Sequence, residues 1–361
     1  GSILHFIADP SLEDKAYAWH EDGLLIVMDG KIQAAGDYAA LHATLPQDLQ
    51  IQDYRGKLII PGFIDTHVHY PQTDIIASPA PGLLPWLDTY TFPAERAFSD
   101  ANHAREVARF FCDELLRCGT TTAMVYCTVH AASVEAFFCE SEQRNLRMVA
   151  GKILMDRHCP EFLRDTAETG IQESEALIKK WHRRGRQLYA ITPRFAPTSS
   201  EMQLQLAGEL AAAYPDTYLQ THVAENIDEI AWVKSLFPKA RSYLDVYDHY
   251  GMLRPRAMYG HGIWLNDVDR LRMAQTQTAT SVCASSNLFL GSGLFDFARA
   301  DQVQMLLSLG TDVGGGNTDV IASLRVDGGI TRITQVPRDT YIEAEGYGPH
   351  KINALYSLGG T

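Results

Sequence analysis

Short apolar runs alternate with amphipathic stretches over most of the chain. Eight of the runs have the length and the flanking turn residues of buried strands, and helical patterns such as 102–117, 174–184, 200–214 and 226–237 lie between them. The predicted strands lie near 59–65, 120–126, 147–154, 188–195, 217–223, 257–263, 278–284 and 304–310. Eight strand–helix units of this size predict an α/β fold, a (β/α)8 TIM-type barrel rather than an open sheet.

The first 58 residues show a different pattern, of short strands and turns. Gly23–Met28 and Lys31–Gly36 have the composition of paired strands, and Asp29-Gly30 between them is typical of a two-residue hairpin turn. We therefore expect a small N-terminal β-sandwich domain over residues 1–58, followed by the barrel domain over 59–361.

Polar side chains with metal-binding chemistry stand at the ends of several predicted strands. His67 and His69 directly follow the first apolar run, and residues two apart in a strand point to the same face. Later runs end in His222, His261 and Asp312. In a barrel of this kind the carboxyl ends of the strands meet at one mouth. Any one histidine is usually a core or loop residue, but five such residues at matching strand ends indicate a metal site.

Three neutral imidazoles and a carboxylate suit Zn²⁺, with Fe²⁺ as a close competitor. A coordination position left open for water makes such a metal catalytic. Glu225 follows His222 by three residues, so the turn after the strand can bring its carboxylate over the pocket. There it suits proton transfer between water and substrate. Its alternative role, compatible with the first, is to favour the N-terminus of the following helix.

Composition excludes several classes of function. With 361 residues and 46% hydrophobic content the chain can bury a large core, and no apolar run is long enough for a membrane helix. A net charge of −13 argues against a nucleic-acid or anionic-membrane partner. Six cysteines without a CxxC pair, and no secretory signal at the N-terminus, favour a reduced, cytoplasmic protein.

The motifs resemble those of a known enzyme family. Pro61–His69, the later histidines and Gly310–Asp312 resemble the amidohydrolase superfamily. Three longer stretches resemble its guanine deaminase family, namely His69–Gln72, Thr192–Ser199 and Ser286–Phe295. The resemblance extends from about residue 23 to about 318. It implies a mononuclear zinc enzyme, a homodimer, that converts guanine into xanthine and ammonia.

The resemblance also implies roles for the residues at the strand ends. The positions that match the metal ligands are His67, His69, His222 and Asp312. His261 matches a histidine that binds or orients the metal-bound water. Glu225 matches the proton shuttle, with Asp312 assisting.

Two further positions match residues that read the guanine ring. Gln72 offers an amide donor and acceptor, and Arg194 is a strong donor to a carbonyl oxygen such as O6. The alternative for Arg194 is a surface ion pair. Phe195 either packs against the purine plane or is a core aromatic, and the segment 83–96 with Trp86 either covers the pocket or packs in the interior.

The chain departs from the family pattern at two places, and rival functions remain open. Cys283–Ser285 replaces a Cys-Pro-Thr sequence, so we expect a mild change in that loop. After Asn317 the stretches 326–333 and 336–348 are strand- or loop-like and unlike the family, and without the family's further strands we expect unpaired edges in the first 58 residues. The rivals are deamination of another ring (8-oxoguanine, a triazine, cytosine) and a non-catalytic metal-binding barrel.

Overall fold

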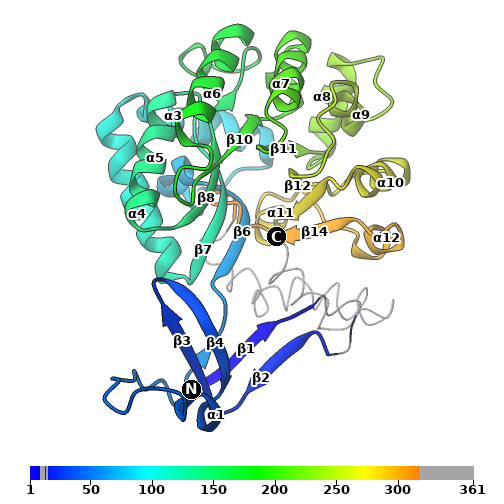
Figure 1. Ribbon diagram of the computed structural model, residues 1–361. Helices are drawn as coiled ribbons and strands as arrows, with labels where there is room; N and C mark the ends of the chain where they lie inside the picture. The colour runs from blue at the N-terminus through cyan, green and yellow to red at the C-terminus, as the bar shows by residue number, and fades with distance from the viewer. Residues whose placement is uncertain (9–12, 14, 317–361) are drawn as a thin grey trace. The chain divides into compact units, whose positions relative to one another are not determined.

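The structure, a computed structural model, describes residues 1–8, 13 and 15–316, so that the stretches 326–333 and 336–348 lie outside the described residues (Figure 1). The described residues fall into two compact units, one up to Gly62 and one from Phe63 onward. We propose that these units are two domains. No helix of the described residues is long and apolar enough to cross a membrane.

The first unit contains two small sheets. Strand β1 (Ser2–Phe6) pairs with β2 (Tyr17–His20) and β5 (Leu58–Ile59), and β3 (Gly23–Met28) forms a hairpin with β4 (Lys31–Asp37) ahead of the short helix α1 (Tyr38–His42). Asp29 and Gly30 both have positive φ, as a two-residue hairpin turn requires. The predicted hairpin is confirmed.

The second unit is a barrel of eight parallel strands. Its strands are β6 (Phe63–His69), β7 (Thr120–Tyr126), β8 (Arg147–Gly151), β10 (Leu188–Pro193), β11 (Tyr218–Val223), β12 (Ala257–His261), β13 (Ala279–Val282) and β14 (Leu306–Leu309), with the two-residue β9 (Ile153–Leu154) beside β10. The N–H of Asp312 donates to the His67 carbonyl (2.8 Å) and that of His69 to the Val313 carbonyl (2.9 Å), which nearly closes the ring between β14 and β6. The predicted (β/α)8 barrel is confirmed.

Helices cover the outside of the strands, as Figure 1 shows for α4 to α7. The helices of this unit are α2 (Leu83–Trp86), α3 (Phe92–Arg96), α4 (Ala101–Arg117), α5 (Ala131–Gln143), α6 (Ala167–Trp181), α7 (Glu201–Ala213), α8 (Ile227–Leu236), α9 (Tyr243–His249), α10 (Asp267–Thr276), α11 (Ala284–Phe289) and α12 (Phe297–Gln302). Helix α6 begins seven residues before the predicted start, because the Thr166 side chain accepts the Thr169 N–H and caps the helix there. The predicted capped start of α8 at Asn226 is confirmed by a capping box with Glu229.

The first barrel strand lies later than predicted. Pro61 and Gly62 interrupt the apolar run. Leu58–Ile59 ahead of them belongs to the first unit, where it pairs with β1. Strand β6 therefore begins at Phe63 and includes both histidines, which stand inside the strand rather than behind it. Below them, Met124, Val149, Ala190 and Met258 fill the barrel with a buried apolar layer.

Candidate active site

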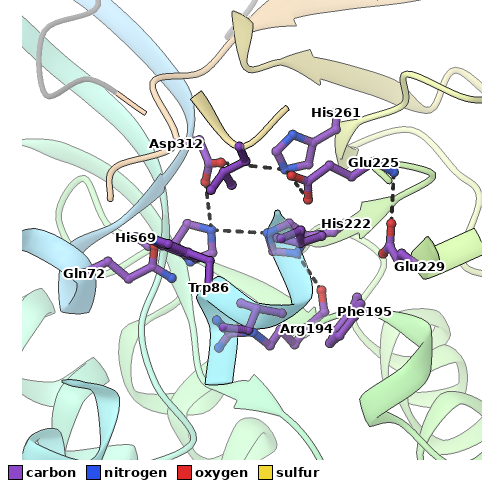
Figure 2. A pocket seen from close by; sticks show the side chains of 13 residues that line it. His69, Gln72, Trp86, Arg194, Phe195, His222, Glu225, Glu229, His261 and Asp312 are labelled. Atoms are coloured by element: carbon purple, nitrogen blue, oxygen red, sulfur yellow. Dashed lines mark hydrogen bonds and ion pairs between the residues drawn. The ribbon is translucent and has the colours of Figure 1, made fainter. Parts of the chain in front are cut away.

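The five strand-end residues meet at the carboxyl end of the barrel, where Figure 2 shows four of them, His69, His222, His261 and Asp312. The Nε2 atom of His69 lies 3.3 Å from Nε2 of His67, 3.2 Å from Nε2 of His222 and 3.2 Å from Oδ1 of Asp312. Asp312 Oδ1 is also 3.3 Å from His67 Nε2, and Asp312 Oδ2 is 3.8 Å from Nε2 of His261. The structure thus brings together side chains that are up to 245 positions apart in the sequence.

Hydrogen bonds behind the rings determine which nitrogen faces the centre. His222 Nδ1 lies 2.7 Å from the Arg194 carbonyl oxygen, and His261 Nδ1 lies 2.9 Å from Asn287 Oδ1. Because a carbonyl oxygen only accepts, each Nδ1 carries the proton and each Nε2 presents a lone pair. The Nε2 lone pairs of His222 and His261 therefore point into the centre beside the Asp312 carboxylate, an arrangement that a cation stabilises.

The spacing of these atoms also fits a metal ion. Bonds of about 2.0–2.1 Å to a tetrahedral ion place its ligand atoms about 3.3 Å apart. The measured separations around His69 are of this size. His67, His222, His261 and Asp312 also form a group whose ligand atoms lie within 4.8 Å of one another. The residues present therefore fit a divalent cation.

Burial keeps the imidazoles of His67, His69 and His222 neutral, the form that binds metal. It lowers the pKa of His67 to about 4 and the pKa of His222 well below its usual value. Burial acts in the opposite direction on Asp312, but hydrogen bonds with His67 and His69 outweigh it and hold the pKa of this carboxyl well below its usual range. For His261, the Glu225 and Asp312 carboxylates outweigh burial, so its pKa is raised.

Two glycines make room for His67 inside the barrel. A Cβ at Gly260 on β12 would lie 2.4 Å from Cε1 of His67, and one at Gly310 would lie 2.6 Å from its Cβ. The ring of Tyr126 on β7 lies 4.8 Å from that of His67 and stacks on that of His69 at 4.4 Å. No other residue type at 260 or 310 leaves this space, so the neighbouring strands help to position the ring.

Glu225 lies in the turn between β11 and α8 and is buried beside the histidines. Its Oε1 accepts a hydrogen bond from Ser292 Oγ (3.0 Å), and its Oε2 lies 3.3 Å from His261 Nε2. Burial raises the pKa of Glu225 to about 7, so that it can both give and take a proton near neutral pH. The helix-start role proposed as an alternative belongs to Glu229, which accepts the backbone N–H groups of Glu225 and Asn226.

The residues expected to read a substrate line the same cavity. Its walls are His69, Gln72, Leu83, Trp86, Leu87, Arg194, Phe195, His222, Glu225, Glu229, His261, Leu290 and Asp312. Gln72 Oε1 accepts the N–H of Gly314 (3.0 Å), which leaves the Nε2 group as the donor side of the amide. Phe195 lines the cavity and also packs edge-to-face on Trp232, at 6.1 Å between ring centres. Phe195 is thus a core aromatic that also lines the cavity, and its packing against a purine ring stays a prediction.

Arg194 forms an ion pair, but a buried one. Its Nη1 donates to both carboxylate oxygens of Glu95, at 2.8 Å each, and the two side chains are 3% and 0% exposed. The guanidinium also lies over the ring of Phe92, 5.3 Å from its centre. The alternative of a surface ion pair is wrong, because the segment that contains α3 covers this side chain. Trp86 in the same segment lines the cavity.

Sequence reasoning missed four residues that contact the site, namely Glu95, Ser286, Asn287 and Ser292. The last three lie in the stretch Ser286–Phe295, which resembles the guanine deaminase family. The resemblance does not indicate which residues these side chains contact. Nothing in the sequence around Glu95 connects it with Arg194, which lies 99 positions away.

Comparisons with known proteins agree with this geometry. A model of the amidohydrolase family matches residues 58–335. A guanine deaminase of Escherichia coli K12 is 46% identical over 316 residues, which cover 88% of this chain and 72% of the relative. The structure of a guanine deaminase from Bradyrhizobium japonicum matches with a TM-score of 0.92 and 35% identity, over 100% of this chain and 81% of its own.

A third similar protein was solved with a ligand. The guanine deaminase of C. acetobutylicum with guanine bound in the active site matches with a TM-score of 0.87 and 25% identity, over 100% of this chain and 84% of its own. The matched family model spans most of the chain, and the relatives match over most of their own length. The chain belongs to the amidohydrolase family and, within it, to the guanine deaminases.

Proposed function

We propose that the protein hydrolyses guanine to xanthine and ammonia, with Zn²⁺ as the metal. One observation carries this proposal: a cluster of converging imidazole and carboxylate ligands shares a cavity with a buried glutamate of pKa about 7 and with a buried arginine. The ligand cluster would hold a metal that activates water, the glutamate would transfer protons, and the arginine would recognise a carbonyl oxygen. The names of the similar proteins support the same substrate.

His67, His69, His222 and Asp312 would hold the metal, with His261 beside it. The ion, when bound, would lower the pKa of a water molecule, so that the water loses a proton and becomes a nucleophile at neutral pH. Asp312 remains ionised and accepts a proton from the attacking water. Glu225 protonates N3 of the purine, which makes C2 electrophilic. As the water oxygen bonds to C2, the second water proton passes through the Glu225 carboxylate to the amino group, the C2–N bond breaks, and ammonia leaves. The proton held by Asp312 then returns to Glu225.

Recognition of guanine follows from the polar groups on the opposite wall. Arg194 would donate a hydrogen bond to O6 of guanine. The amide nitrogen of Gln72 would donate a hydrogen bond to another acceptor atom of the ring. Phe195 and Trp86 supply flat apolar surfaces for the ring. Adenine places an amino group where O6 stands, so it would leave the N–H groups of Arg194 that Glu95 does not accept facing another donor. A site of this kind rejects such an analogue by a large factor.

The proposal is tested by ammonia release and the absorbance change with guanine, using zinc-loaded protein and Glu225→Gln as the matched control. Turnover of guanine that the control lacks supports both the reaction and the role of Glu225. Preferred turnover of 8-oxoguanine, cytosine or a triazine would replace guanine as the substrate. One tightly bound zinc per chain without turnover of any ring would favour the non-catalytic metal-binding barrel.

We further propose a cytoplasmic homodimer that acts in purine metabolism. The six cysteines are all free thiols, as in a reducing compartment. Two-fold symmetric dimers are by far the commonest oligomers of soluble enzymes. Light scattering of the purified protein measures the oligomeric state, and a monomer at micromolar concentration would contradict this part of the proposal.

A further inference from the structure

One short segment contacts three of the groups proposed to carry the reaction. It consists of α11 and the turn after it, residues 284–293, and we call it the α11 segment. Ser286 Oγ donates to Asp312 Oδ2 (2.6 Å), Asn287 Oδ1 accepts from His261 Nδ1 (2.9 Å), and Ser292 Oγ donates to Glu225 Oε1 (3.0 Å). All three side chains of the segment are buried.

The three groups it contacts come from separate parts of the barrel. Glu225 follows β11, His261 ends β12, and Asp312 follows β14, while the α11 segment is the first part of the connection between β13 and β14. We propose that the α11 segment is a positioning device, which fixes these three groups relative to one another through Ser286, Asn287 and Ser292. The inference rests on the proposed function, because it assigns the three groups to one reaction.

Each contact uses one atom of the group and leaves the reactive atom free. Ser286 binds Oδ2 of Asp312, while Oδ1 faces His67 and His69. Ser292 binds Oε1 of Glu225, while Oε2 faces His261. Asn287 holds the proton of His261 on Nδ1, which presents the Nε2 lone pair to the centre. Loss of any one contact frees a carboxylate or ring to rotate away from its productive position.

The backbone of the segment is itself held rigidly. The N–H of Ser292 donates to the Asn287 carbonyl (2.8 Å), and the indole Nε1 of Trp264 donates to the Ser292 carbonyl (2.9 Å). Gly291 has a φ of +69°, and a Cβ on Gly293 would lie 3.2 Å from both Ile263 and Trp264. The turn is therefore packed closely against the residues that follow His261, so its side chains have little freedom to adjust.

The experiment compares four variants of the zinc-loaded, full-length protein. Ser286→Ala, Asn287→Ala and Ser292→Ala each remove one contact, and Leu288→Ala changes a half-exposed side chain of the same helix as the control. Thermal melting verifies that each variant is folded. If alanine at 292 unfolds the protein, Ser292→Cys replaces it, since a thiol is a weak donor of similar size. Ser292→Thr restores the hydroxyl and should restore activity.

Kinetics separate a positioning role from a merely structural one. We expect Ser292→Ala to lower kcat about 10-fold with KM for guanine changed less than about 3-fold. In a Glu225→Gln background the same change should cost no further activity, because Ser292 acts through Glu225. An equal loss in both backgrounds, or parental kcat in Ser292→Ala, would overturn the inference.

Metal affinity gives a readout that does not depend on turnover. We expect Asn287→Ala and Ser286→Ala to weaken Zn²⁺ binding about 10–100-fold in competition with a chelator, and Leu288→Ala to leave it unchanged. Unchanged affinity in the first two variants would overturn the inference. Absence of guanine turnover in the parent would refute the proposed function alone, since the metal measurement would still test the α11 segment.

Discussion

The buried ion pair between Glu95 and Arg194 offers a sharp test of how the cavity is stabilised. The change Glu95→Gln keeps the shape of the side chain and one of its two acceptor oxygens, but it removes the negative charge. Arg194 then remains charged at 3% exposure, with both Nη1 hydrogen bonds to the carboxylate at 2.8 Å replaced by a single one. We expect a clear loss of stability.

The size of the loss follows from the burial of both groups. Removal of one partner from a buried pair costs about 3–5 kcal/mol, because the other charge is left without compensation. The Phe92 ring lies under the guanidinium in both proteins and does not change this difference, whereas the glutamine side chain still supplies one of the two acceptor oxygens. The net cost is therefore near the lower end, about 3 kcal/mol. For a unit of this size that lowers the melting temperature by about 6 °C.

The assay is thermal unfolding with and without Zn²⁺, with Glu142→Gln as the matched control. Glu142 pairs with Arg184 through two hydrogen bonds of 2.8 Å on the surface, where solvent screens the charges, so its loss should change the melting temperature little. A melting temperature of Glu95→Gln within 1 °C of the parent would refute the reasoning. If the pair is coupled, adding Arg194→Met to Glu95→Gln should recover part of the lost stability.

Four further outcomes are expected. Glu225→Gln should lower kcat about 10²–10⁴-fold with little change in KM for guanine, as measured by ammonia release, and a loss confined to KM would contradict proton transfer. Gly260→Ala should weaken Zn²⁺ binding at least about 10-fold in chelator competition, because its Cβ would overlap the His67 ring; parental affinity would show that the ring can shift freely. A chelator should lower the melting temperature and abolish turnover, with Zn²⁺ restoring both, whereas full activity after verified metal removal would exclude the proposed mechanism. In the metal-free protein, Glu225→Gln should gain stability relative to the parent between pH 5 and pH 8. The folded-state pKa of about 7 lies above the usual 4.5, so the parent loses stability as pH rises through 7, by up to about 3 kcal/mol, and a constant difference in melting temperature would contradict this sign.

The barrel and the strand-end cluster were predictable because both follow from local signals. Each buried strand is a continuous apolar run, and the residue at its carboxyl end is placed at the mouth by the fold itself. His222, His261 and Asp312 could therefore be located from three separate short stretches. The predicted start of the first strand was wrong because Pro61 divides one apolar run between two sheets.

The contacts that support these residues could not be predicted in this way. Glu95 and Arg194 belong to elements 99 positions apart, and their pairing depends on how α3 packs over the cavity. The polar residues of the α11 segment look ordinary in the sequence, since nothing local indicates that their partners lie after β11, at the end of β12 and after β14. The supporting contacts depend on tertiary packing, whereas the strand ends can be located from the alternation of apolar runs and amphipathic stretches along the chain.

The hydrogen bond from His222 to the carbonyl of Arg194 links two tasks in a single peptide unit. The backbone of residue 194 orients a proposed ligand, while its side chain lines the wall where a ring would be read. A change in the path of the loop at residue 194 would move the carbonyl that orients His222 together with the side chain that lines the cavity. A change of substrate made in this way would therefore weaken metal binding. Specificity in this scaffold can therefore change by replacing side chains such as Arg194 and Gln72, but not by altering the length or path of the chain after β10.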